Sequence, residues 1–217
     1  MIREDVKLNI GCGPTGLDGW LNFDWGVLPL FSKAPALRRL VIAMGLLSAS
    51  YDTRWPKIKL VDIRRRFPLE DESVKFIYCS HVLEHFERWE ALAILRECRR
   101  CLRQGGVMRV VVPDIRKLFS NYQSWVAAGQ ARAGRDFCRL WWGFDKDIAP
   151  GSVLGKLARR FVRDHAWNYD CEELDLLVKE AGFSKMTVCD CHQGALPDLD
   201  RLDIDGHKSH SIYVEIL

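Results

Sequence analysis

The chain has 217 residues, of which 48% are hydrophobic and 28% charged, a composition that excludes a disordered or fibrous protein. Its 32 basic and 29 acidic residues leave a net charge of +3, so charge gives no strong case for nucleic-acid binding. The first ten residues contain no long apolar run, and we therefore expect no secretory signal, a cytoplasmic location and reduced cysteines.

Seven apolar runs rich in β-branched residues predict strands at 6–10, 20–24, 58–62, 74–80, 107–113, 185–190 and 211–216. Several of these runs are apolar at successive positions, which is typical of parallel strands buried on both faces. Helical patterns lie between them at 34–48, 86–103, 115–127 and 171–181. The alternation predicts an α/β fold with a doubly wound sheet, in one domain over 1–217.

The first strand runs into "GCGPTG", residues 11–16, whose G-x-G-x-x-G spacing brings backbone close to a ligand. A dinucleotide would also need a helix start and an acidic residue about 20 positions later, yet "LDGW" follows Gly16 and Asp24 comes sooner. A ligand without phosphate fits better, with Asp24 accepting hydrogen bonds from ribose hydroxyls. The crossover of about nine residues to the second strand is either one irregular turn or a sign that the strand is misplaced.

The segment 28–56 is expected to be a variable helical segment. From 36 to 49 only Arg38 and Arg39 are charged, so they should mark a polar edge beside a broad apolar face, and the helix is too short to span a bilayer. Two interpretations remain open. The helix packs on the sheet, or part of it forms a lid or a peripheral membrane anchor beside the ligand site.

The segment 115–168 follows the fifth strand and is rich in Trp, Arg, Gly and Phe. It predicts a helical insertion placed over the carboxyl ends of the sheet, where open α/β sheets bind their ligands. Further on, Asp170 and Glu173 predict the capped start of the helix at 171–181.

Two sets of side chains raise the question of metal binding. Cys98 and Cys101 recur with leucines at helical spacing and should face a core, while strand alternation in "CDCH", 189–192, separates Cys189 from Asp190. The sequence "HVLEH", 81–85, matches the H-x-x-E-H pattern of inverted zinc hydrolases. That pattern has to lie within a helix, whereas His81 follows an apolar run at a strand-to-helix junction. No metal is therefore expected.

Five stretches occur in the order of a known family: "LNIGCG", "WLNFD", "LVDIRRRFPLEDESVKFIYCSHVLEHF", "ILRECRRCLRQGGVMRVVVPD" and "HAWNYDCEELDLLVKEAGF". Together they resemble a class I S-adenosylmethionine-dependent methyltransferase and, more narrowly, small bacterial methyltransferases of surface-glycan or small-molecule pathways. The resemblance omits about 28–56 and 125–160. It implies a Rossmann-like sheet and S-adenosylmethionine as cofactor. Gln104 and Ala166 depart from the proline and lysine common in the family.

The resemblance also implies residue roles. The methionine part of the cofactor would lie against the glycine turn, and its ribose against Asp24. Its adenine would lie beside the loop after the third strand, and its sulfonium near the end of the fourth strand. In chain order, the cofactor-binding residues would be Gly11, Cys12, Gly13, Asp24, Asp62, Ile63, Ser80 and His81. Three residues are candidates for acceptor contact or for the base, namely His81, His165 and Asp114.

Each candidate has a structural alternative. Asp114 could cap the next helix, His85 could be a packing residue, and the arginines at 64–66 should be a solvated face. The predicted function is methyl transfer to a small acceptor, a sugar or glycan hydroxyl, without nucleic acid. Other classes kept open are a zinc hydrolase, a nicotinamide dehydrogenase and a non-catalytic cofactor-binding module. The oligomeric state is not predicted.

Overall fold

The computed structural model describes residues 5–44, 51–143 and 164–217. In this part of the chain one sheet of seven strands has the order β3-β2-β1-β4-β5-β7-β6. The first five strands run parallel, and β7 is antiparallel to both β5 and β6. The strands are β1 (Lys7–Ile10), β2 (Leu21–Asp24), β3 (Ile58–Leu60), β4 (Val74–Ser80), β5 (Leu102–Pro113), β6 (Met186–Cys189) and β7 (Ser211–Ile216).

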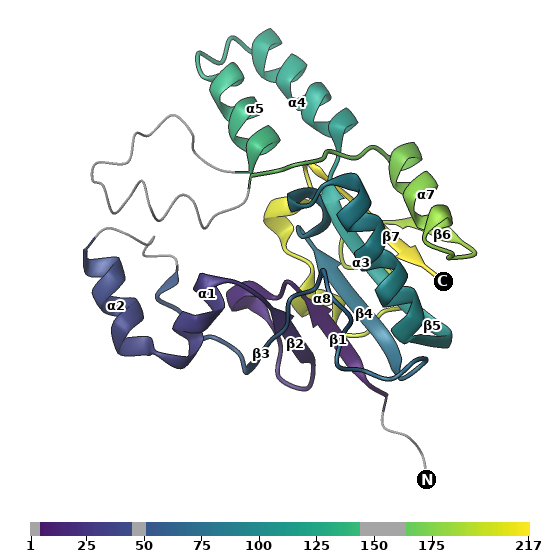
Figure 1. The fold of residues 1–217 in the computed structure, drawn as a ribbon. Helices are drawn as coiled ribbons and strands as arrows, with labels where there is room; N and C mark the ends of the chain where they lie inside the picture. Colours follow the sequence, from purple (N-terminus) through teal and green to yellow (C-terminus); the bar gives the residue numbers. More distant parts are fainter. Residues whose placement is uncertain (1–4, 45–50, 144–163) are drawn as a thin grey trace.

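Helices cover both faces of this sheet (Figure 1). On β4, Ile77 and Cys79 pack into one apolar cluster with α3 and α7, whereas Tyr78 packs into a second cluster with α8. The predicted doubly wound, mostly parallel Rossmann-like sheet is therefore confirmed. The described helices are α1 (Val27–Leu30), α2 (Pro35–Ala43), α3 (Arg88–Cys101), α4 (Ile115–Ala127), α5 (Ala133–Trp142), α7 (Cys171–Glu180) and α8 (Leu199–Leu202).

The short crossover between β1 and β2 is a single 3-10 turn over Gly13–Thr15. Of the two readings of this spacing, the irregular turn is correct and the second strand is in its predicted place. The local signals at α7 also hold, because the Asp170 side chain accepts a hydrogen bond of 2.9 Å from the amide of Glu173. Cys98 and Cys101 are fully buried in the core, as predicted.

Two predictions of detail are wrong. The fifth strand begins at Leu102, five residues before the predicted start, because α3 passes directly into β5. Arg38 lies buried rather than on a polar edge, since its guanidinium stacks over the Trp55 ring at 6.0 Å and lies 3.7 Å from the Asp52 carboxylate. Part of the helix predicted at 34–48 lies outside the described residues.

The insertion after β5 contains α4 and α5, which pair and project away from the sheet (Figure 1). Aromatic contacts hold them together: Phe137 lies 5.3 Å from both Phe119 and Tyr122, measured between ring centroids, and 5.6 Å from Trp141. A parallel bridge between Asp114 and Tyr169 joins the two ends of the insertion. Within the described residues, no helix combines the length and apolar character needed to cross a membrane.

Candidate functional site

The carboxyl ends of the parallel strands bring the predicted site residues to one edge of the sheet. The glycine turn follows β1, Asp24 ends β2, Ser80 ends β4, and Asp114 follows β5. In open α/β sheets this edge is where ligands bind. A surface hollow of about 620 Å³, lined by Glu72 and Arg96 among others, lies at the opposite end of β4 and touches none of these residues. We therefore locate the site by its chemistry.

Asp24 organises the glycine turn. Its carboxylate accepts hydrogen bonds of 2.7 Å from the backbone amides of Gly13 and Trp25, one on each oxygen. Burial raises the pKa of Asp24, while these two hydrogen bonds act to lower it. Each carboxylate oxygen can accept a further hydrogen bond, so the group can receive a diol such as a ribose edge. A β-carbon on Gly13 would point into open space, which leaves room for a ligand over the turn.

Gly11 couples this turn to the end of β4. Its φ is +64°, a left-handed conformation that favours glycine, and a β-carbon there would clash with Cγ2 of Val82. Cys12, the next residue, is buried, and burial together with the neighbouring Asp24 raises the pKa of its thiol. The thiol is therefore neutral and inert, and Cys12 contributes to the site through its backbone.

The loop after β3 carries Asp62 and the buried Ile63. Asp62 accepts a bidentate pair of hydrogen bonds from Arg64, each 2.8 Å, which lowers the pKa of its carboxyl. The arginines at 64–66 are exposed, as predicted for a solvated face. Asp62 and Ile63 thus lie beyond the carboxyl end of β3, where the resemblance places the adenine. Their contact with the adenine stays a prediction.

The chain turns sharply after Ser80. His81 has a φ of +52°, which is unusual for a residue other than glycine and marks a strained position often found at functional sites. Its amide donates a hydrogen bond of 2.9 Å to the carbonyl of Val111, which anchors the turn to β5. Its ring lies between Glu84 and Ser211, with Nδ1 3.0 Å from Oε1 of Glu84 and Nε2 3.0 Å from Oγ of Ser211.

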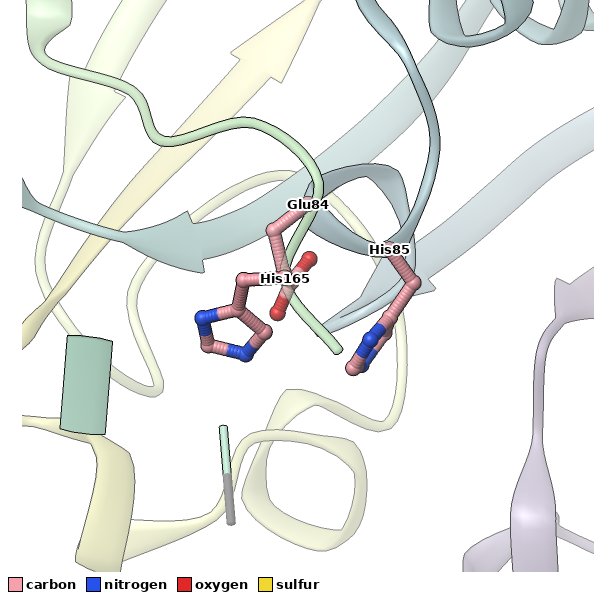
Figure 2. Close-up of side chains that lie close together, drawn as sticks. All are labelled: Glu84, His85 and His165. Carbon is pink, nitrogen blue, oxygen red and sulfur yellow. The ribbon is translucent and has the colours of Figure 1, made fainter. Parts of the chain in front are cut away.

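Glu84 is the centre of the group beyond this turn (Figure 2). Its side chain is fully buried, and within the described residues neither carboxylate oxygen has a partner with the geometry of a hydrogen bond. Burial acts to raise the pKa of Glu84, but His81 and the charges of His85 and His165 outweigh it, so the pKa is lowered. A buried carboxylate that stays charged requires positive or hydrogen-bonding neighbours.

His85 and His165 complete the group. Their rings lie 5.0 Å apart between centroids, and one nitrogen of each ring lies within 4.8 Å of a Glu84 oxygen and of the other nitrogen. Nδ1 of His165 donates to the carbonyl of Trp141 at 2.9 Å, and Nδ1 of His85 donates to the carbonyl of Asp164 at 3.3 Å. A carbonyl only accepts, so each Nδ1 carries the proton and the neutral ring has its lone pair on Nε2.

The electrostatics of His165 differ from those its sequence neighbours suggest. Burial lowers the pKa of His165 despite the charge of Glu84, which acts to raise it. His165 is therefore neutral at pH 7. Glu84, rather than the adjacent aspartates, is the carboxylate that faces this ring.

Two site histidines were missed by the sequence analysis. His207 packs against His81 with 3.9 Å between ring centroids, and His210 lies 5.7 Å from His207. Burial, followed by the charge of His81, lowers the pKa of each to about 4. They come from "DGHKSH", a polar stretch before the last strand. The signal that could have found them is position, because this stretch precedes a strand antiparallel to its neighbours and so ends at the same sheet edge.

Asp114 serves as a helix cap. Its side chain accepts a hydrogen bond of 2.9 Å from the amide of Arg116, and its own amide donates to the carbonyl of His210. The structural alternative for Asp114 is thus present. Contact with an acceptor stays a prediction.

The inverted zinc-hydrolase interpretation does not fit the structure. Residues Leu83–His85 form a 3-10 turn, and His81 lies before it with a left-handed backbone. The two histidines of "HVLEH" therefore do not share one helix face as that class requires. His81 contacts Glu84 instead, whereas His85 meets His165 from a distant part of the chain.

Known proteins resemble parts of this chain in sequence. A family model described as a methyltransferase domain matches residues 42–110. A probable S-adenosylmethionine-dependent methyltransferase of Mycobacterium tuberculosis is 25% identical over 169 residues, which are 73% of this chain and 48% of that protein. The chain thus spans about half the length of the curated relatives it matches.

Solved structures share the fold. A methyltransferase of Clostridium acetobutylicum has a TM-score of 0.53 at 13% identity, with 98% of this chain and 83% of that chain covered. The PH0226 protein of Pyrococcus horikoshii has a TM-score of 0.52 at 18% identity, with 99% and 82% covered. The sheet, the carboxyl-edge site and these likenesses agree: in sequence and in fold the chain is similar to class I S-adenosylmethionine-dependent methyltransferases.

Proposed function

We propose that the chain transfers the methyl group of S-adenosylmethionine to a hydroxyl of a small acceptor, a sugar or a glycan. The observation that carries the proposal is the pairing of two features at one sheet edge. Asp24 and the glycine turn offer a diol-binding carboxylate, and the buried Glu84 with its histidines lies directly beyond the same edge.

The first feature holds the donor. Asp24 is fixed by two backbone amides and keeps acceptor capacity for two ribose hydroxyls. Gly13 leaves the turn open toward the ligand. When bound, the cofactor supplies a sulfonium, which is an already activated methyl donor, so the protein chiefly has to align the two reactants and exclude water.

The second feature suits a hydroxyl acceptor. An acceptor oxygen forms its new bond to the methyl carbon as the carbon–sulfur bond breaks, and the electron pair of that bond stays on sulfur. The hydroxyl proton leaves the acceptor. The rings of His85 and His165 and a buried carboxylate on Glu84 form a set of groups that can orient the hydroxyl and accept its proton. A primary amine is protonated at neutral pH and would be attracted by the carboxylate, but it has to lose a proton before its nitrogen can accept the methyl group. Amines are therefore tested beside hydroxyls.

Calorimetry with S-adenosylhomocysteine tests the donor site. Asp24→Ala should weaken binding by roughly 1–3 kcal/mol, the cost of leaving buried polar partners unsatisfied. Asp18→Ala is the matched control, because Asp18 is exposed in the same loop, and it should bind like the wild type. Unchanged affinity in Asp24→Ala would remove Asp24 from the ribose role.

The acceptor is then tested by release of S-adenosylhomocysteine in the presence of free sugars, nucleotide sugars and primary amines. We expect turnover with a hydroxyl acceptor. Turnover confined to amines, in a protein that binds the cofactor, would overturn the sugar assignment and leave the methyltransferase assignment intact.

We also propose that α2 makes peripheral contact with membranes or with a lipid-linked acceptor. Leu37, Leu40 and Met44 are each about half exposed, at 50%, 55% and 52%, while Arg38 faces inward. Flotation with liposomes, with and without anionic lipid, tests this contact. Wild type should float and a Leu40→Glu, Met44→Glu variant should stay in solution. If both stay in solution, the proposal fails.

A further inference from the structure

We propose that Glu84, His85 and His165 bind a divalent first-row transition-metal ion, for which Zn²⁺ is the best match, on the acceptor side of the site. The inference deepens the proposed function. It rests on that function only for the role of the ion, which is to act on the acceptor. Binding of the ion itself is a separate property with its own measurement.

The first support is convergence of lone pairs. Three potential ligand atoms, one from each residue, lie within 4.8 Å of one another, and Figure 2 shows the three side chains side by side. Ligand atoms around a tetrahedral Zn²⁺ lie about 3.4 Å apart, given Zn–N and Zn–O distances near 2.1 Å. The side chains therefore have to close by at most about 1.4 Å, which small χ rotations achieve.

The second support is the state of the Glu84 carboxylate. It is fully buried, and neither oxygen accepts a hydrogen bond of proper geometry from the residues described. An unsatisfied buried carboxylate costs several kcal/mol unless a cation or donors neutralise it. His81 approaches only Oε1, at 3.0 Å. One of the two buried oxygens of Glu84 thus lies within 4.8 Å of a ring nitrogen of His85 and of His165.

The third support is the orientation of the two rings. Histidines that bind metals almost always donate their other ring N–H to a carbonyl or a carboxylate, which fixes the tautomer. Nδ1 of His165 is held by the carbonyl of Trp141, and Nδ1 of His85 by the carbonyl of Asp164. Both rings therefore have the tautomer that a metal ion requires on Nε2.

Gly143 keeps one ligand atom accessible. It has a φ of +81°, and a β-carbon there would clash first with Nε2 of His165. Any larger residue would cover the lone pair that the ion needs. Two imidazoles and one carboxylate form a donor set that suits Zn²⁺ and similar ions rather than Mg²⁺, and three protein ligands leave a position open for a hydroxyl. An ion in this place would hold and polarise the acceptor hydroxyl.

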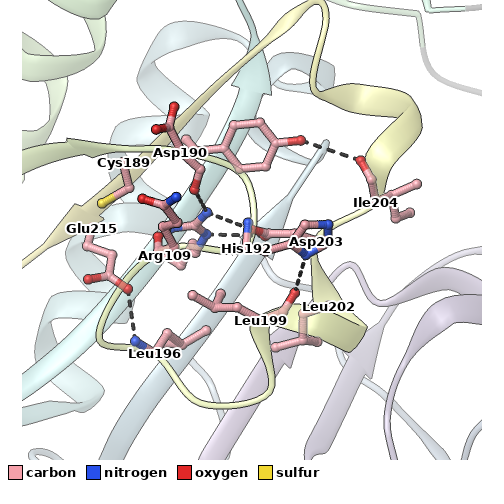
Figure 3. Close-up of polar contacts among 12 residues, drawn as sticks. Arg109, Cys189, Asp190, His192, Leu196, Leu199, Leu202, Asp203, Ile204 and Glu215 are labelled. Atoms are coloured by element: carbon pink, nitrogen blue, oxygen red, sulfur yellow. Dashed lines mark hydrogen bonds and ion pairs between the residues drawn. The ribbon is translucent and has the colours of Figure 1, made fainter.

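A second cluster supplies an internal control. Cys191, His192 and Asp203 also bring three potential ligand atoms within 4.8 Å of one another. There, however, the carboxylate is saturated, because Asp203 accepts from Arg109 (Figure 3). The His192 ring nitrogens contact the carbonyl of Leu199 and the Asp205 carboxylate. We expect this second cluster to bind no metal ion.

The test uses the full chain, stripped with a chelator and titrated with Zn²⁺ by calorimetry, followed by metal analysis of the dialysed protein. We expect one Zn²⁺ per chain in the wild type and in the control His192→Gln. Glu84→Gln, His85→Gln and His165→Gln should each bind at least about tenfold more weakly. Three ligand variants are used so that a misfolded one does not decide the outcome.

Titration with Co²⁺ distinguishes the two clusters by spectroscopy. Binding at Glu84, His85 and His165 gives visible d–d absorption without thiolate charge-transfer absorption, whereas binding through Cys191 adds the thiolate band. Absence of stoichiometric metal in the wild type, unchanged affinity in the folded ligand variants, or a thiolate band that His192→Gln removes would each overturn the proposal. Binding of S-adenosylhomocysteine, measured on the same samples, reports separately on the proposed function.

Discussion

Two buried carboxylates, Glu84 and Asp203, occupy opposite faces of the same sheet and differ in how their lone pairs are used. The Asp203 carboxylate forms an ion pair of 2.5 Å with Arg109 and accepts hydrogen bonds from the amide of His192 and the hydroxyl of Tyr78. Arg109 also donates to the carbonyls of Asp190 and Gln193 (Figure 3). Every charge in this network has a partner.

Glu84 is equally buried but faces imidazoles whose protons point away from it. The difference teaches how to separate structure from function among buried charges. A saturated network fixes the chain and has nothing left to offer a ligand. A buried carboxylate without well-formed hydrogen bonds costs stability, and such a group is kept where a ligand offsets that cost.

The largest effect expected from this contrast is a loss of turnover when a residue of the Glu84 group is replaced. His165→Ala should lower the rate of methyl transfer by about 10²–10⁴-fold, the usual contribution of a positioned acid–base or polarising group, with nearly unchanged cofactor affinity. His192→Ala, from the saturated region, is the control and should keep its rate. Full turnover in His165→Ala on the true acceptor would assign the role to His81 or Asp114.

A loss of stability is expected instead when the network around Asp203 is changed. Arg109→Met leaves the Asp203 carboxylate buried without its cation, and the free energy of unfolding should fall by about 3–5 kcal/mol. Urea denaturation followed by circular dichroism measures the change. The double variant Arg109→Met, Asp203→Leu should recover part of the loss. A loss below about 1 kcal/mol in the single variant would mean that the network is not a structural anchor.

Acidification should act through His207 and His210. Their pKa values of about 4 in the folded chain lie below the ordinary value of 6.5. The unfolded chain therefore binds more protons between pH 6.5 and 4, and the stabilisation from these rings is complete above pH 6.5 and lost as the pH falls toward 4. With about 1.4 kcal/mol per unit of pKa and a discount for partial exposure, the loss is on the order of 2–3 kcal/mol.

Unfolding measured in urea across this pH range tests the expectation. The slope should flatten in a His207→Gln, His210→Gln variant, which retains every carboxylate of the wild type. An identical slope in both proteins would show that other groups cause the acid sensitivity.

The smallest effect is expected for Glu84→Gln in metal-free protein. No hydrogen-bond donor loses a well-formed partner and an unsatisfied buried charge is removed, so the free energy of unfolding should change by less than about 1 kcal/mol. Urea denaturation in the presence of a chelator measures it. A loss as large as that of Arg109→Met would show that Glu84 already has a full set of partners and would remove the contrast between the two regions.

The fold followed from local signals, whereas half of the site did not. Continuous apolar runs predicted each strand, and the glycine turn together with Asp24 could be placed because these residues are close in sequence and end adjacent strands. The meeting of Glu84 with His165 could not be predicted, because 81 positions separate them and an irregular insertion lies between.

Charge patterns in the sequence led to wrong expectations where contacts with distant residues decide whether a side chain is buried. Arg38 looked like a polar edge, but Asp52 and the ring of Trp55 draw it inward. Asp164 precedes His165 in the sequence, yet burial dominates the pKa of His165, and the carboxylate that acts on it is Glu84. Residues adjacent in the sequence thus did not indicate which charged groups lie close to a side chain in the fold.

The helix pair α4–α5 has a consequence for protein engineering. Its aromatic side chains pack on one another, and its two stems meet at the bridge between Asp114 and Tyr169. An inserted unit with adjacent stems and its own internal packing can be exchanged between scaffolds without moving the strands that carry it. Chimaeras joined at these two positions would exchange His165 together with the helix pair, so they would change the candidate site and leave the strands with Asp24 and the glycine turn in place.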